Sequence, residues 1–196
     1  MKNYPLILAS ASPRRQDLLR RCGVDFTVQS VDIEELTGAG DIALVPEINA
    51  RNKALAVAAA NPGCWVLGAD TMIIFENRAI GKPADMAEAF ALLKSFSGRT
   101  HEVITGMALL NKEEDIAEVW SCKSEVKFKK LSDAVIKEYL ECVPVLDKAG
   151  AYAIQDHGEL IVERFSGEME NIIGMPLKKL QLLLKKYSIG GNLVRK

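Results

Sequence analysis

Strand-like and helix-like segments alternate along this chain, and the alternation limits the folds that it can adopt. A short apolar run at 5–9 and a long one at 65–75 predict buried strands, and helices are expected over 46–60 and 86–96. The run "VITGMALL" and an alternating segment over 117–128 predict a hairpin around "NKEED". Interleaved strands and helices with some antiparallel pairing indicate an α/β protein.

Capping residues define several of the remaining elements. Ser12 can cap a helix that starts at Pro13, where proline is well tolerated, and Gly23 suits the end of that helix. Ser132 can cap another helix in the same way. The other expected elements are strands at 25–35 and 159–165, a helix at 133–142 and a last helix that begins at 176 and runs to 187.

Size and composition favour one globular domain. The chain has 196 residues, of which 48% are hydrophobic and 26% charged, so it can bury a sizeable core. We expect a single domain over 1–196, with a frayed tail at 188–196. The net charge is −1, which predicts no binding to a nucleic-acid polymer or to a membrane. An anion site must therefore come from a local concentration of charge.

Cysteine usage and the N-terminus point to a cytoplasmic protein. The four cysteines form no CxxC pair, and only two histidines could join them, so a structural zinc site is not expected. The apolar run at 6–9 is too short for a signal peptide, and no stretch approaches the length of a membrane span. Reduced thiols in the cytoplasm are the economical interpretation.

The stretch "LASASPRRQDLLRR" places two arginines at the start of a helix. This end of a helix already carries partial positive charge, so cations there are mildly unfavourable unless an anion joins them. Backbone N–H groups, the hydroxyls of Ser10 and Ser12, and the forked donors of Arg14 and Arg15 would suit a phosphate. The alternative is a capped helix whose arginines face water.

Asp70 interrupts the apolar segment "WVLGADTMIIF". An ionisable group in an apolar strand is costly unless it is paired or solvated in a cleft. Active sites tolerate that cost, because such a carboxylate can bind a metal or take a proton from water. Gly68 allows close backbone approach beside it. The alternative is a carboxylate satisfied by neighbouring N–H groups at a bulge.

Other charged residues carry little meaning when each is taken alone. Lys53 lies in the helix expected over 46–60, and Lys82 lies in the "GKP" loop; either can be ordinary surface charge. Glu34 and Glu35 end a strand, where they could supply a second carboxylate for a divalent ion or form a polar terminus.

The segment "DKAGAYAIQ" has two interpretations that the sequence leaves open. Its small residues let a backbone approach a flat ligand, Tyr152 could stack on that ligand, and Gln155 could read a base edge. The competing interpretation is a packed turn between a helix and a strand.

Eight motifs in order give the chain a resemblance to a known family. Together "LASASPRR", "EE", "ARNKA", "GADT", "GKP", "SGRTHEVITG", "DKAGAYAIQ" and "IIGMPL" resemble the Maf family over roughly residues 6–184. That family is similar in fold to nucleoside-triphosphate pyrophosphatases of the inosine-triphosphate type. The resemblance implies a mixed central sheet flanked by helices, with a cleft between two lobes, and it is compatible with a homodimer.

The resemblance also implies an activity and a set of site residues. Members hydrolyse nucleoside triphosphates to the monophosphate and pyrophosphate with a divalent cation, and "DKAGAYAIQ" resembles the branch that acts on dTTP and UTP. Asp70 matches the proton acceptor. The positions that set substrate choice correspond to Arg14, Thr71 and Gln155, and other active-site positions correspond to Ser10, Arg15, Glu35, Lys53 and Lys82.

These residues suggest one reaction, with two rivals. The cations would surround a triphosphate, Mg²⁺ or Mn²⁺ would be held by Asp70 and Glu35, and Asp70 would direct water at the α-phosphorus. Whether Asp70 is a metal ligand or a general base stays open. One rival is a nucleotide-binding regulator of septum formation with little turnover. The other is a sugar-phosphate phosphatase, which would release orthophosphate.

Overall fold

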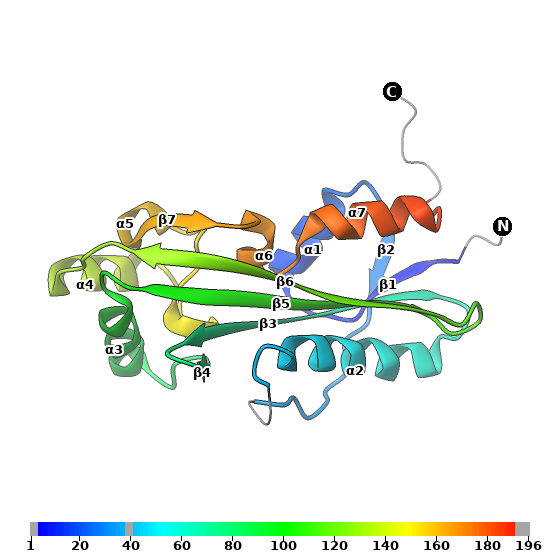
Figure 1. Ribbon diagram of the computed structural model, residues 1–196, viewed down its shortest axis with the longest axis horizontal. Coiled ribbons are helices and arrows are strands. Elements are labelled where there is room, and N and C mark those ends of the chain that lie inside the picture. Colours follow the sequence, from blue (N-terminus) through cyan, green and yellow to red (C-terminus); the bar gives the residue numbers. More distant parts are fainter. Residues whose placement is uncertain (1–3, 38–40, 191–196) are drawn as a thin grey trace. The chain divides into compact units, whose positions relative to one another are not determined.

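The computed structural model describes residues 4–37 and 41–190, which divide into two compact units (Figure 1). The first unit comprises Met1–Thr71, Thr105–Cys122 and Gly174–Lys196, and the second comprises Met72–Ile104 and Lys123–Ile173. The chain therefore passes between the units several times. The single domain expected over 1–196, and the cleft between two lobes, stay predictions.

A mixed sheet confirms the α/β class expected from the sequence. Its strand order is β2-β1-β3-β5-β6-β7, where β5 covers Thr100–Asn111, and β4 is paired to β3. β1 (Leu6–Leu8) runs parallel to β2 (Phe26–Val28) and to β3 (Trp65–Phe75). β4 (Arg78–Ile80) is antiparallel to β3, and β7 (Val162–Ser166) is antiparallel to β6 (Ile116–Phe128).

In the first unit, helices cover both faces of the sheet (Figure 1). α2 (Val45–Ala60) lies on one face, and α1 (Pro13–Arg20) and α7 (Leu177–Lys186) lie on the other. A small-residue core forms beneath α2, made by Ile7, Ala9, Ala50, Ala54, Val57, Ala58, Val66, Ala108 and Leu110. These short side chains keep α2 close to the strands.

Two glycines allow this close approach. A Cβ on Gly68 of β3 would lie 2.2 Å from the carbonyl oxygen of Ala50. A Cβ on Gly106, in β5 (Thr100–Asn111), would lie 2.2 Å from the carbonyl oxygen of Pro46. Any side chain at either position would push α2 away from the sheet. The close backbone approach expected at Gly68 is thus an approach by the backbone of α2, which packs directly against β3.

The second unit surrounds an aromatic and aliphatic core. Its helical elements are α3 (Met86–Phe96), α4 (Asp133–Cys142), the 3₁₀ turn η1 (Ala149–Ala151), α5 (Gly158–Ile161) and α6 (Met169–Ile173). The fully buried side chains of this core include Phe96, Phe128 and Tyr139. α3 packs against α4 and η1 around these rings.

Local signals predicted several boundaries correctly. α3 and α4 begin and end where expected, and each has a capping side chain: Asp85 accepts from the N–H of Glu88, and Ser132 accepts from that of Val135. α1 starts at Pro13 with Ser12 at the N-cap position, as expected, but the Ser12 side chain makes no capping hydrogen bond.

Two expected strands differ from the structure. The strand expected over 25–35 is confined to Phe26–Val28. The segment at 159–165 was expected to be one strand, but its first half belongs to α5 and only its second half to β7. A short apolar run has no periodicity of its own, so "ELIV" fits a helical turn as well as a strand.

α7 has the two faces expected of it. Leu177, Leu180, Leu183 and Leu184 are buried, and Trp65 stacks against Tyr187 with ring centroids 4.9 Å apart. After α7, Ile189 is 2% exposed, and the rest of the expected tail, 191–196, lies outside the described residues.

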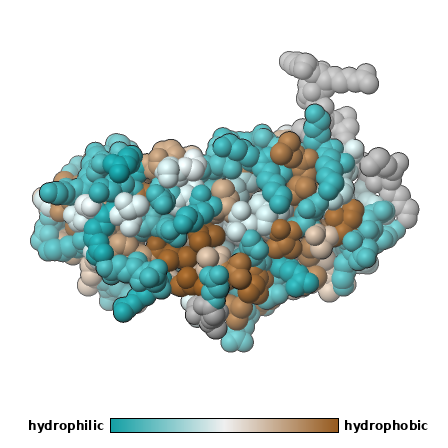
Figure 2. Space-filling view, viewed as in Figure 1, coloured by the Kyte–Doolittle hydropathy of each residue, from teal (hydrophilic) through white to brown (hydrophobic). Residues whose placement is uncertain are grey.

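The surface is mixed. Figure 2 shows hydrophilic side chains over most of one face with hydrophobic ones among them. Leu182, on the outer side of α7, is 69% exposed. Within the described ranges, no helix has the length and apolar composition needed to cross a membrane.

Candidate active site

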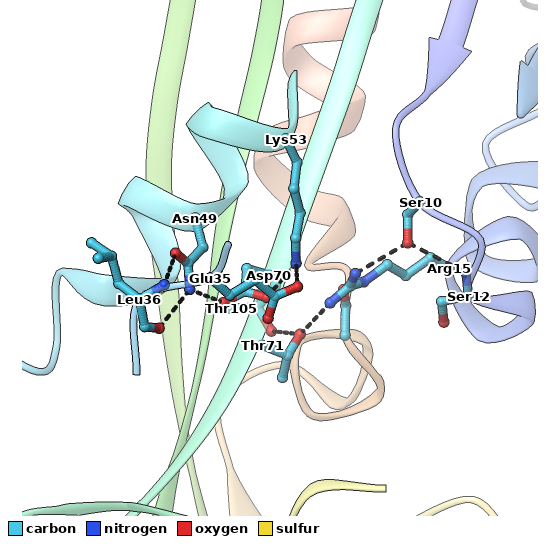
Figure 3. A network of polar contacts seen from close by, with 11 residues as sticks. Ser10, Ser12, Arg15, Glu35, Leu36, Asn49, Lys53, Asp70, Thr71 and Thr105 are labelled. Carbon is cyan, nitrogen blue, oxygen red and sulfur yellow. Dashed lines mark hydrogen bonds and ion pairs between the residues drawn. The ribbon is translucent and has the colours of Figure 1, made fainter. Parts of the chain in front are cut away.

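Asp70 lies at the centre of a charged cluster in the first unit (Figure 3). Its Oδ1 is 2.7 Å from Nζ of Lys53, and the same ammonium lies 2.7 Å from Oε1 of Glu35. The side chains of Asp70 and Lys53 are 9% and 13% exposed, whereas that of Glu35 is 50% exposed. One cation thus serves two carboxylates, and the cluster is open to solvent on the side of Glu35.

Asn49 completes the surroundings of Asp70. Its Nδ2 donates to Oδ2 of Asp70 at 3.1 Å and to the carbonyl of Leu36 at 3.0 Å. Its Oδ1 accepts from the N–H of Leu36 at 2.9 Å. Asn49 and Lys53 lie one turn apart on α2, so they reach the two oxygens of one carboxylate from the same face of the helix.

Arg15 organises the loop between β1 and α1. Its Nη1 donates to Oγ of Ser10 at 3.1 Å, its Nη2 to Oγ1 of Thr71 at 3.1 Å, and its Nε to the carbonyl of Gly174 at 3.0 Å. Burial lowers the pKa of Arg15, while the charges of Asp70 and Glu35 act in the opposite direction. The guanidinium of Arg15, which the sequence suggested as a phosphate ligand, therefore already donates to three protein oxygens.

Thr71, which directly follows Asp70, and Thr105 extend the hydrogen-bond network of Arg15. Oγ1 of Thr71 lies 3.0 Å from Oγ1 of Thr105, which is fully buried on β5. Gly174 has a φ of +124°, and a Cβ there would lie 3.2 Å from Oγ1 of Thr71. The conformation at Gly174 thus favours glycine and keeps the space beside Thr71 open.

Arg14 occupies a different environment from its neighbour. It is half-buried at the first turn of α1, next to the N–H groups that begin the helix. Its charge lowers the pKa of Arg15, so the two guanidinium groups are close enough to repel each other. An anion at this end of α1 would relieve that repulsion.

Of the nine expected site residues, six fall into this network, Arg14 lies beside Arg15 at the first turn of α1, and two lie elsewhere. The six are Ser10, Arg15, Glu35, Lys53, Asp70 and Thr71. Lys82 lies on an exposed loop after β4, and Gln155 lies in an exposed turn before α5. Both belong to the second unit, and their roles in binding or catalysis stay predictions.

The stacking suggested for Tyr152 is wrong. Tyr152 is 6% exposed, its hydroxyl lies 2.8 Å from Nε2 of His101, and its ring packs edge-on against Phe128. His101 also stacks on Phe96, with ring centroids 4.6 Å apart. Tyr152 is therefore a core residue, and the packed-turn interpretation holds for this part of "DKAGAYAIQ".

Sequence reasoning missed Asn49 and Thr105. A signal existed for Asn49: it lies four residues before Lys53, on the helix face that also carries the buried Ala50 and Ala54. A polar residue in such an apolar stripe needs a partner. For Thr105 there was no comparable signal, because threonine is common in strands.

The donor set around Asp70 fits a divalent cation that arrives with phosphate. Mg²⁺ is usually held by one or two carboxylates together with substrate phosphates and water, and Asp70 and Glu35 supply two carboxylates around one point. Within the part of the chain that the structure describes, no three His, Cys, Asp or Glu side chains form a metal-binding group. The metal ligation expected of Asp70 and Glu35 stays a prediction.

The fold places the chain in a known structural class. It is similar to the structure of the Ham1 protein of Staphylococcus aureus, with a TM-score of 0.56 over 93% of this chain and 99% of that chain. Only 15% of the residues are identical, so this likeness concerns the fold. This protein and the Ham1 protein thus share one α/β fold.

The chain belongs to the Maf family, whose profile, described as Maf-like protein, matches residues 5–187. A dTTP/UTP pyrophosphatase of Clostridioides difficile is 43% identical to it over 184 residues, which are 93% of this chain and 94% of the relative. A dTTP/UTP pyrophosphatase of Myxococcus xanthus is 43% identical over 186 residues, 94% of this chain and 93% of the relative. The resemblance found in the motifs is thus confirmed along almost the whole chain.

Proposed function

We propose that this protein is a nucleoside triphosphate pyrophosphatase that hydrolyses dTTP and UTP to the monophosphate and pyrophosphate. One observation carries the proposal: a nearly buried carboxylate, Asp70, is held by an ammonium and an amide in a cluster that opens to solvent at Glu35. A purely structural ion pair has no need of the second carboxylate. The substrate comes from the relatives, which are named as dTTP/UTP pyrophosphatases.

The proposed mechanism divides the work among the charged groups. Asp70 orients or deprotonates a water molecule directed at the α-phosphorus, and Lys53, 2.7 Å from its Oδ1, holds the carboxylate in place. Arg14 at the start of α1, with Lys82, stabilises the charge that grows on the leaving pyrophosphate. Ser10 and Thr71, whose hydroxyls accept hydrogen bonds from Arg15, are proposed to contact the substrate.

A divalent cation is part of the proposal. Mg²⁺ or Mn²⁺ bound to the triphosphate would be held by Glu35 and Asp70, and it would neutralise phosphate charge. In that state Lys53 and the metal would together neutralise the two carboxylates and part of the phosphate charge. Gln155 and Thr71 are proposed to contribute to the choice of nucleobase.

A panel of nucleoside triphosphates tests the proposal. Each is incubated with the protein and Mg²⁺ or Mn²⁺, and pyrophosphate is measured separately from orthophosphate. We expect pyrophosphate from dTTP and UTP at rates well above those from ATP or GTP. Orthophosphate alone would indicate a phosphatase, and binding of nucleotide without turnover would indicate a regulator of cell division.

Cellular location and assembly complete the proposal. We place the protein in the cytoplasm, which agrees with its four free cysteines, because thiols stay reduced there. A homodimer is proposed from the family resemblance alone, and the mass of the protein in solution tests it.

A further inference from the structure

Asn49 is a buried polar residue that the proposed mechanism does not yet use. It is 1% exposed and lies among the fully buried residues Val45, Ala50 and Ala54 on the inner face of α2. Burial of an amide is costly unless its hydrogen bonds are satisfied. Its contacts therefore show what this position requires.

The backbone of Leu36 fixes the orientation of the Asn49 amide. The N–H of Leu36 needs an acceptor, so Oδ1 of Asn49 must face it, at 2.9 Å. The amide nitrogen must then lie on the other side, where it donates to the carbonyl of Leu36 at 3.0 Å and to Oδ2 of Asp70 at 3.1 Å. A flipped amide would place an oxygen against a carboxylate and a carbonyl.

The same contacts connect the two carboxylates. Leu36 directly follows Glu35, so the amide that holds Leu36 also holds the segment that brings Glu35 to Lys53. Asp70 is fixed at one oxygen by Asn49 and at the other by Lys53. The terminal torsion of an aspartate is otherwise broad, so these two contacts decide where its carboxylate plane lies (Figure 3).

We propose that Asn49 is a positioning residue, which sets the carboxylate plane of Asp70 and holds the segment of Glu35 against α2. This inference rests on the proposed function where it concerns turnover, and on the contacts alone where it concerns geometry. Arg14 and Lys82, which are proposed to bind the phosphates, are not held by Asn49, so loss of Asn49 acts on the chemical step more than on affinity.

Two substitutions at Asn49 and two at Asn52 test the effect on turnover. Asn49→Leu removes every hydrogen bond of the amide, while Asn49→Asp keeps an acceptor for Leu36 but loses the donor to Asp70. Asn52 is an exposed residue of the same helix, so Asn52→Leu and Asn52→Asp are matched controls. We expect kcat for dTTP to fall by about 10- to 100-fold in both Asn49 variants, with KM within about threefold.

The controls should keep kcat within about twofold, because Asn52 touches neither carboxylate. Folded Asn49 variants that retain the kcat of the unchanged protein would overturn the inference. Equal losses at Asn49 and Asn52 would also overturn it, because they would show a general effect on α2.

A spectroscopic test does not depend on turnover. The side-chain amide signals of Asn49 in a ¹H–¹⁵N spectrum are identified by their absence from either Asn49 variant. In Asp70→Ala these signals should move, because the acceptor of one N–H is gone, while those of Asn52 should stay in place. Unmoved Asn49 signals would overturn the inference. If no nucleotide is hydrolysed but the signals move, the proposed function fails and the positioning of Asp70 by Asn49 stands.

Discussion

Each unit contains a cluster of buried polar side chains, and the two clusters offset the cost of burying polar groups in opposite ways. Around Asp70 the groups are charged: Lys53 pairs with the carboxylate, and the neutral amide of Asn49 donates a hydrogen bond to it. Around His101 the groups are neutral, and aromatic rings surround them. Burial lowers the pKa of His101 to about 4, and it raises the pKa of Tyr152.

The difference agrees with the catalytic role proposed for the Asp70 cluster and with a purely structural role for the His101 cluster. The Asp70 cluster retains charge and reaches solvent through Glu35, whose side chain is half exposed. The His101 cluster excludes both charge and water, since His101 is 2% exposed and Tyr152 6%. Charged groups that remain paired at an opening can act on a substrate, whereas neutral groups sealed among rings contribute to stability.

The largest effect expected from this comparison is the loss of activity in Asp70→Asn. The amide keeps the size of the side chain but cannot accept a proton from water, so pyrophosphate release should fall by about 10³-fold. Asp17→Asn, at an exposed carboxylate of α1 whose side chain is 71% exposed, is the control and should remain active. Activity of Asp70→Asn within tenfold of the unchanged protein would place the chemistry elsewhere.

The next effect concerns stability. Lys53→Met leaves Asp70 without its cation in a nearly buried position, and the free energy of unfolding should fall by about 3–5 kcal/mol. Lys94→Met breaks an exposed ion pair in which Nζ of Lys94 lies 3.0 Å from Oδ1 of Asp133. It should lower the free energy of unfolding by less than about 1 kcal/mol. Urea denaturation measures both. Similar losses in the two variants would show that the Asp70 cluster is energetically an ordinary surface pair.

The His101 cluster should make stability depend on pH. Unfolded histidine takes up a proton near pH 6.5, but His101 in the folded protein resists it until about pH 4, so acid favours the unfolded state. Stability is complete above pH 6.5 and should fall by up to about 3 kcal/mol between there and pH 4. His101→Phe should remove this part of the loss. His157→Asn, at the exposed histidine, should leave it unchanged.

The smallest effect is expected from Tyr152→Phe. It removes the hydroxyl that lies 2.8 Å from His101, and should lower the free energy of unfolding by about 1 kcal/mol. The KM for dTTP should stay within about threefold, because Tyr152 belongs to the core. A large rise in KM at unchanged stability would mean that this hydroxyl touches the nucleotide. In a His101→Phe background the hydroxyl has lost this partner, so the same substitution should no longer lower the free energy of unfolding.

Much of the fold could be predicted because local signals agreed with tertiary packing. The capped helices α3 and α4 and the long apolar strand β3 have their expected bounds. The prediction failed where the apolar run was short, as at α5 and β7. There His157, at a φ of +53°, precedes a single helical turn that hydrophobicity alone does not reveal.

The site could be predicted only in part. Asp70 could be predicted as a site residue because a carboxylate interrupts an apolar strand. Lys53 and Glu35 could be predicted only through the family resemblance, and the structure then shows the Lys53 ammonium in contact with both carboxylates. The position of Asn49 in an apolar helix stripe indicates that it needs a partner, but the partners depend on the fold, since Leu36 and Asp70 lie 13 and 21 positions away in the chain. Contacts between distant segments leave little trace in local sequence.

The most direct test of the account is the position at which water enters the nucleotide. The protein is allowed to hydrolyse dTTP with its divalent cation in H₂¹⁸O, and both products are examined by mass spectrometry. Attack of water at the α-phosphorus, as proposed for Asp70, predicts ¹⁸O in dTMP and none in the pyrophosphate. Label in pyrophosphate or in orthophosphate, with unlabelled dTMP, would contradict it.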